Sequence, residues 1–183
     1  MNTNIETNNS GIVFPEVINN FRVYNDAARV MGTTGEISLA PLQAMTASVS
    51  GAGILGEYTT SVAGMFQSMS QEIPFRMIDR DYFNMLNTGE QSKIVLRSSV
   101  QQRNRETGGT LSTQAMRFVF RGHPTAANFG TVKIGDLMNA SITLELTYLL
   151  AEIGGVTVLE LDKLNSIYKV NGKDLLADIM KQC

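Results

Sequence analysis

The feature most suggestive of chemistry is the glycine-rich string GAGILG at residues 51–56. It matches G-x-G-x-x-G, the fingerprint of a loop that binds a dinucleotide pyrophosphate. That loop works only when a helix follows it directly, because the free N–H groups of the first helical turn bind the phosphates. The residues that follow are EYTTSV, which are rich in β-branched side chains and unfavourable for a helix. We therefore interpret the string as a flexible or subunit-contacting loop, with nucleotide binding as the weaker alternative.

The other nucleophilic and titratable residues form no recognisable catalytic or metal-binding set. His123 is the only histidine, and the only cysteine, Cys183, ends the chain. The candidate carboxylates have only the spacing of helix capping and strand alternation: Asp79, Asp81, Glu160 and Asp162. Acid–base catalysis and metal binding need such groups in convergent sets. The residues therefore predict neither a metal site nor an acid–base catalytic set.

Five arginines mark one face of a predicted hairpin, which is formed by residues 91–105 and 111–122 around a Thr-Gly-Gly-Thr turn. Period-two alternation places the apolar residues on one face, namely Ile94, Leu96, Val100, Met116, Phe118 and Phe120. It places the arginines on the other, namely Arg97, Arg103, Arg105, Arg117 and Arg121. Because no aromatic residues are interleaved with them, this face lacks the stacking platform of a single-strand nucleic-acid binder. We interpret it as a solvated face or a salt-bridged subunit contact.

Length and composition indicate one folded domain. The chain has 183 residues, of which 43% are hydrophobic and 17% charged, with a formal net charge of −2. Residues 1–11 are predicted to be a polar tail and residues 12–183 a single domain. No apolar run approaches the roughly 20 residues of a membrane span, and the N-terminus does not resemble a signal peptide. We expect a protein made in the cytoplasm without a membrane anchor.

The hydrophobic pattern predicts a mainly β subunit, a β-sandwich or barrel with one internal and one C-terminal helix. Runs of β-branched and apolar residues on both sides of residues 51–56 predict two long strands within residues 41–75. Further strands are predicted at residues 17–24 and 29–31 as a hairpin, and at 36–39, 141–151, 156–161 and 166–170. Helices are predicted at residues 79–86, with Asp79 as N-cap, and at 173–181, with Leu175, Leu176 and Ile179 on one stripe; residues 123–131 are predicted to be a loop.

Five blocks of the sequence, in order, resemble the major tail tube protein of contractile-tailed bacteriophages, a family that also supplies the tubes of R-type phage-tail-like bacteriocins. The blocks are PEVINNFRVYN from Pro15, SGAGILGEY from Ser50, EIPFRMID from Glu72, ITLELTYLLAEIGG from Ile142 and VLELDKLNSIYKVNGKDLLADIMKQC from Val158. The resemblance implies a structural protein that is not an enzyme and needs no cofactor. Its subunits would close into six-fold rings whose strands join into one β-barrel around a channel, and the rings would stack into a tube that a contractile sheath drives through the target envelope.

Strand alternation, applied to the barrel that the resemblance implies, suggests roles for particular residues. Polar faces of the predicted barrel strands would line the channel: Ser48, Ser50, Ser68, Ser70, Glu72, Thr143, Glu145 and Thr147. Their hydroxyls and carboxylates would repel the phosphates of passing DNA. The opposite faces would pack against the rest of the subunit: Met45, Val49, Met65, Met69, Ile142, Leu144 and Leu146.

Two further surfaces are expected to contact partners. The glycine loop would contact a neighbouring subunit through Gly51, Gly53, Ile54, Leu55, Gly56 and Tyr58. The helix at residues 79–86 would lie on the outside of the tube, where Asp79 and Asp81 meet the sheath protein. We expect assembly in the bacterial cytoplasm and a final place in a virion tail or a released tail-like particle. A soluble β-barrel binding module is the alternative reading.

Overall fold

The computed structural model describes residues 13–26, 28–30, 32, 33, 35–104 and 109–182. The predicted tail at residues 1–11, Met31, Arg105 and Cys183 lie outside this range. The strands are β1 (Val13–Asn25), β2 (Ala28–Arg29), β3 (Ala44–Ser50), β4 (Glu57–Phe66), β5 (Ser70–Phe75), β6 (Ser92–Asn104), β7 (Thr110–Asn128), β8 (Ala140–Ile153), β9 (Val156–Asp162), β10 (Ile167–Val170) and β11 (Lys173–Asp174); the helices are α1 (Arg80–Asn84) and α2 (Ala177–Met180). The predicted mainly β fold with two helices is confirmed.

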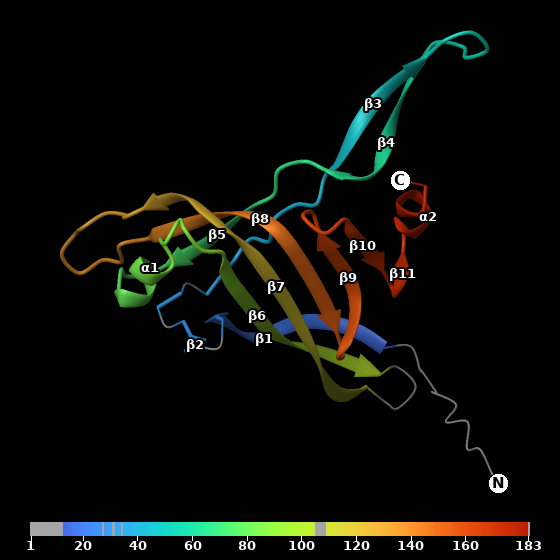
Figure 1. The fold of residues 1–183 in the computed structure, drawn as a ribbon. Coiled ribbons are helices and arrows are strands. Elements are labelled where there is room, and N and C mark those ends of the chain that lie inside the picture. The colour runs from blue at the N-terminus through green and yellow to red at the C-terminus, as the bar shows by residue number, and fades with distance from the viewer. Residues whose placement is uncertain (1–12, 27, 31, 34, 105–108, 183) are drawn as a thin grey trace.

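One antiparallel sheet forms the body of the subunit, in the order β11-β10-β9-β8-β7-β6-β1-β2 (Figure 1). Strand β8 is its centre, because β7 pairs along one edge while β5 and β9 share the other. Strands β3 and β4 form a separate two-stranded sheet that stands off from this body. The body and the projecting hairpin are therefore distinct parts of the subunit.

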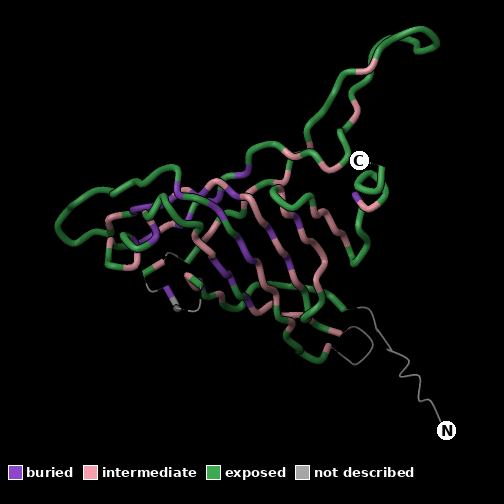
Figure 2. Tube along the Cα trace, in the orientation of Figure 1, coloured by how far each residue is buried: buried purple, intermediate pink, exposed green. Residues whose placement is uncertain are grey.

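The predicted hairpin of β6 and β7 is confirmed, together with its two faces. Ile94 pairs with Phe120 and Leu96 with Phe118, which places these four side chains on the same face of the sheet. Buried residues concentrate along β6, β7 and β8, whereas the β3–β4 hairpin has none (Figure 2). The core is completed by fully buried side chains from β5, from α1 and its C-cap, and from β8: Ile73, Phe75, Tyr82, Met85, Ile142, Leu144 and Leu146.

The predicted strand at residues 36–39 is wrong, because the segment has no strand pairing. The side chain of Gln71, which is fully buried, takes the place of a neighbouring strand. Its Oε1 accepts a hydrogen bond from Ala40 N at 2.9 Å, and its Nε2 donates to Ser38 O at 2.8 Å. The alternation of polar and apolar residues identified an extended segment but not its hydrogen-bonding partner.

The predicted loop at residues 123–131 is also wrong over most of its length, since β7 continues to Asn128. Proline interrupts a strand because it has no N–H to donate. Beyond Gly122, however, β7 pairs only with β8 and has left β6 behind. At Pro124 the edge of β7 that faced β6 is unpaired, so no backbone N–H is needed there. The pairing with β8 also shifts register between Pro124 and Ala126.

Both helices are shorter than predicted. Asp79 is confirmed as the N-cap of α1, since its Oδ1 accepts a hydrogen bond from Tyr82 N at 3.0 Å. Residues 173 and 174 pair with β10 as β11, so α2 begins only at Ala177. Of the predicted apolar stripe only Leu176 is buried, and it fits against Gly64 of β4.

Replacing Gly122 with alanine is expected to destabilise the subunit, because the new Cβ would lie 2.1 Å from the backbone oxygen of Glu145 on β8. Backbone at a sheet centre has little room to move, and overpacking of this kind typically costs about 1–3 kcal/mol or more. For a chain of this size that lowers Tm by roughly 2–12 °C in thermal unfolding. Gly35→Ala is the matched control, since nothing lies within 4 Å of its added Cβ. Equal Tm values for the two variants would contradict the close packing of β7 on β8.

Candidate assembly surfaces

A polar surface lies where β5 pairs with β8. Ser70 lies directly opposite Glu145, and Glu72 lies opposite Thr143. Glu145 also holds the segment before β5, since its Oε2 accepts from Ser68 Oγ at 2.7 Å and its Oε1 from Met69 N at 3.2 Å. The structure thus brings together most of the predicted polar set: Ser68, Ser70, Glu72, Thr143 and Glu145, with Thr147 further along β8.

Ser48 and Ser50 are not part of this surface. Both lie on β3, in the projecting hairpin, where Ser48 pairs with Thr59 and Ser50 with Glu57. Ser48 Oγ donates a hydrogen bond to the Glu57 carboxylate across the hairpin. Within one subunit the eight predicted residues therefore form two groups, one on the hairpin and one on the body.

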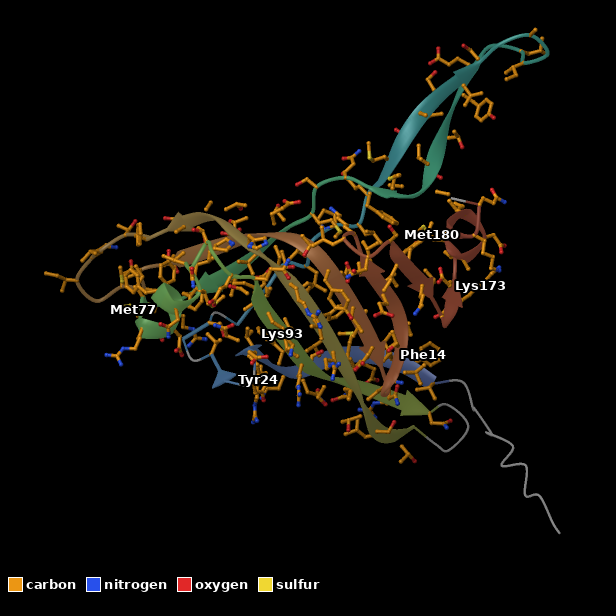
Figure 3. All side chains as sticks on the ribbon, in the orientation of Figure 1. Phe14, Tyr24, Met77, Lys93, Lys173 and Met180 are labelled. Carbon is orange, nitrogen blue, oxygen red and sulfur yellow. The ribbon has the colours of Figure 1, made fainter. Side chains whose placement is uncertain are left out.

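The prediction of which hydrophobic residues pack inside the subunit is partly wrong. Met69 is buried, as are Ile142, Leu144 and Leu146. Met45 and Met65, however, are 47% and 56% exposed, because they lie on the hairpin that projects from the body. Figure 3 shows side chains extending from both faces of this hairpin with no other segment over its outer half.

The base of the hairpin is bent at Gly64 and held by the C-terminal segment. The pairing of β3 and β4 shifts register between Ala44 and Thr46, and Gly64 has a φ of +71° in the left-handed region. An added Cβ there would lie 2.3 Å from Leu176 Cδ2, so the two residues are in close contact. Phe66 and Tyr168 also meet edge to face, with ring centroids 4.8 Å apart. These contacts fix the direction in which the hairpin leaves the body.

The tip of the hairpin is the glycine loop. Gly53 and Gly56 have positive φ values of 89° and 103°, and β4 begins directly after the loop at Glu57. The helix that a pyrophosphate-binding loop requires is therefore absent at this position. Leu55 is fully exposed at 107%, and Tyr58 is also exposed. The loop presents apolar side chains to solvent, which fits contact with another protein surface.

The four described residues of the arginine face have partners within the subunit. Arg117 Nε lies 2.9 Å from Glu152 Oε2, and Arg103 Nε lies 2.9 Å from Glu16 Oε1. Two further arginines cover aromatic rings: Arg97 lies 5.2 Å from the ring centroid of Tyr24, and Arg121 lies 4.5 Å from that of Tyr148. These partners come from β1 and β8, so the residues of the hairpin carried no signal for them.

Neighbouring groups shift two pKa values on this face. The pKa of the Glu16 carboxyl is lowered, chiefly by a 2.7 Å hydrogen bond from Gln101 Nε2 and also by Arg103. Burial raises the pKa of the Tyr148 hydroxyl, and the nearby Glu160 raises it further. Both shifts favour the charge states present at neutral pH, in which the paired arrangement is intact.

The two expected sheath-facing acids lie at the start of α1. Asp79 is exposed and Asp81 half-buried, and both lie at the end of the body away from the hairpin. Among the residues that the structure describes, no three acidic, histidine or cysteine side chains cluster as metal ligands would. In the same part of the chain, helices long and apolar enough to span a membrane are absent.

The fold is that of an antiparallel β body with a projecting two-stranded hairpin. Two solved structures share this fold at TM-scores of 0.51. The first is a chain of the "PVC sheath/tube terminator in extended state" of an extracellular contractile injection system, with 15% identity over 76% of this chain and 97% of that chain. The second is from the "PVC sheath-tube complex in extended state", with 17% identity over 76% and 92%.

The chain belongs to the phage tail tube protein FII family, whose model matches residues 15–182. No curated protein sequence matches the chain. The family is structural and not enzymatic, so the chain is a phage tail tube structural protein. The predicted family and its structural role are confirmed.

Proposed function

We propose that this protein forms the inner tube of a contractile tail as stacked hexameric rings. In each ring the strands of neighbouring subunits join into one β-barrel around a central channel. A sheath surrounds the tube and drives it through the target envelope. The subunits assemble in the bacterial cytoplasm and end in a virion tail or a released tail-like particle. Family membership supports the tube, and the projecting hairpin supports the mode of assembly.

The observation that carries the proposal is the isolation of the β3–β4 hairpin. In the described part of the chain these strands pair only with each other, so their outer edges have unpaired N–H and C=O groups. An isolated two-stranded hairpin is at best marginally stable in water, and exposed strand edges pair readily with other chains. Closure of a ring by strand pairing removes such edges. The hairpin is thus suited to add to the sheet of a neighbouring subunit.

The polar residues of β5 and β8 then become candidates for the channel wall. Ser70, Glu72, Thr143 and Glu145 share one surface of the body, and strand pairing between subunits would align Ser48 and Ser50 with them. Carboxylates on that wall would repel a DNA phosphate backbone, which favours passage over binding. The loop with Gly51, Gly53, Ile54, Leu55, Gly56 and Tyr58 would contact a neighbouring subunit.

Electron microscopy of the purified protein tests this proposal. Negative stain should show rings or tubes whose abundance rises with protein concentration, and a cryo-EM map should place Ser70, Glu72 and Glu145 at the lumen. A tube with these residues away from the lumen would remove the channel assignment but leave the tube. A protein that stays monomeric at all concentrations would instead indicate a soluble β-barrel binding module.

Charge reversal near α1 is expected to weaken sheath assembly while tubes still form. The variant combines Asp79→Asn with Asp81→Lys, since asparagine keeps the N-cap hydrogen bond to Tyr82 N. An exposed ion pair contributes only about 0.2–1 kcal/mol, but every ring repeats it, so we expect a several-fold loss of sheathed particles in sedimentation. Asp178→Lys on α2, whose side chain is 92% exposed, is the matched control. Equal yields of sheathed particles would remove α1 from the sheath interface.

A further inference from the structure

An open apolar groove lies between the core face of the sheet and the segments at residues 32–33 and 35–39. Its volume is about 590 Å³. Phe21, Leu96 and Phe118 of β1, β6 and β7 form the floor, and Ile37 forms a wall. At the mouth, Ile18 is 56% and Leu39 is 44% exposed. The hydrophobic core thus continues into a depression that the subunit's described residues leave open.

Charged residues of both signs line the groove, namely Arg22, Arg76 and Glu36. Arg76, which follows β5, lines the groove and is exposed. Its backbone is fixed on both sides, since Arg76 N donates to Gly32 O at 2.7 Å and Arg76 O accepts from Met138 N at 2.9 Å. Its guanidinium forms no ion pair with a carboxylate among the described residues. Arg76 can therefore pair with a carboxylate on an apolar segment that enters the groove beside it.

The tip of the β3–β4 hairpin combines exposed apolar side chains with a nearby carboxylate. Leu55 is fully exposed, Ile54 is 37% exposed, and Glu57 follows two residues after Leu55. The groove on the same subunit is out of reach, because the hairpin extends away from β1, β6 and β7 (Figure 1). Only the tip of another copy can meet the groove.

We propose that the groove of one subunit binds Ile54 and Leu55 of a second copy, with Arg76 paired to Glu57. This inference rests on the proposed function and names the receptor for its contact loop. The tip and the groove are different surfaces, so the contact is heterologous, and contacts of this type propagate from subunit to subunit. Each subunit would both insert a tip and receive one.

Cysteine cross-linking of assembled tubes tests the proposal. In a Cys183→Ser background, Leu55→Cys and Leu39→Cys together place one thiol on the tip and one at the mouth of the groove. A disulfide forms only when the two Cβ atoms come within about 3.5–4.5 Å. Mild oxidation should give a ladder of covalent multimers on a non-reducing gel, whereas each single variant should give none. Leu55→Cys with Leu164→Cys is the control, since Leu164 is 69% exposed but lies outside the groove.

The outcomes separate this inference from the proposed function. Tubes that form without a ladder, or with equal ladders for the test and control pairs, would overturn the groove contact and leave the tube proposal standing. A Cys183→Ser parent that forms no tubes would count against the tube proposal itself. A third pair, Leu39→Cys with Thr7→Cys, tests whether the chain's own N-terminal residues occupy the groove. A cross-link within one chain for this pair would also overturn the inference.

A charge exchange gives an independent measurement. Arg76→Glu and Glu57→Arg should each lower the yield of tubes about tenfold, because each puts two like charges together at a contact that excludes water. The double variant should recover most of the yield, since it restores an opposite-charge pair. Circular dichroism of each variant shows whether the subunit is folded. A double variant no better than the worse single variant would contradict the pairing of Arg76 with Glu57.

Discussion

Replacing both Ile54 and Leu55 with aspartate is expected to give a folded subunit that no longer forms tubes. Leu55 is fully exposed and Ile54 lies beside it in the tip loop, so their substitution should change the free energy of unfolding by no more than about 0.5 kcal/mol. In the assembled tube the same carboxylates would be buried without partners, at several kcal/mol each. Even a loss of only about 3 kcal/mol per contact would weaken association roughly 100-fold.

The measurement combines thermal unfolding of the subunit with sedimentation and electron microscopy of its assemblies. Leu164→Asp, in the turn between β9 and β10, changes another highly exposed leucine and should leave tubes intact. Normal tubes from the tip variant would show that the loop is not an assembly contact. A tip variant that fails to fold would show that the loop supports the subunit itself.

Replacing Gln71 with leucine is expected to destabilise the subunit far more than replacing an exposed glutamine. The variant removes the acceptor of Ala40 N and the donor to two backbone oxygens, Ser38 O and Glu72 O, each at 2.8 Å. A buried backbone group left without a partner costs about 1–3 kcal/mol. Because Ser38 is exposed and its oxygen can reach water, we expect a total loss of about 2–4 kcal/mol.

For a chain of this length that loss corresponds to a fall in Tm of roughly 4–16 °C, which calorimetry or circular dichroism measures. Gln43→Leu is the matched control, since Gln43 is exposed just before β3. If the two variants unfold at the same temperature, the segment at residues 36–40 is held by its apolar contacts and not by Gln71.

Hydrophobic alternation, turn residues and helix-capping residues predicted the elements whose partners are near in sequence. The β6–β7 hairpin follows from two alternating runs joined by a glycine turn, and its apolar and arginine faces were predicted correctly. The N-cap Asp79 was also predicted, because capping involves only residues within one turn of the helix. Failures came where a distant segment decided the outcome, as with Gln71 beside residues 38–40 and Pro124 at the edge of β7.

For the assembly surfaces too, features set by neighbouring residues were predicted and features set by distant segments were not. The strand after the glycine loop was predicted correctly, since the β-branched residues there favour a strand and β4 begins at Glu57. The packing of Met45 and Met65 was predicted wrongly. Alternation along a strand shows which residues share a face, but not whether another layer covers that face. On a hairpin that leaves the body, no layer of the same subunit covers it.

By itself the sequence determined the mainly β class, the family, the absence of a phosphate-binding helix after residues 51–56, and the polar character of the β5 and β8 surface. These properties depend on residue type and on neighbours within a few positions. Only the tertiary structure decided that β3 and β4 project as a separate hairpin bent at Gly64, and that an apolar groove remains open beside β1. Both depend on contacts between segments far apart in the chain, such as Gly64 with Leu176, which no local pattern encodes.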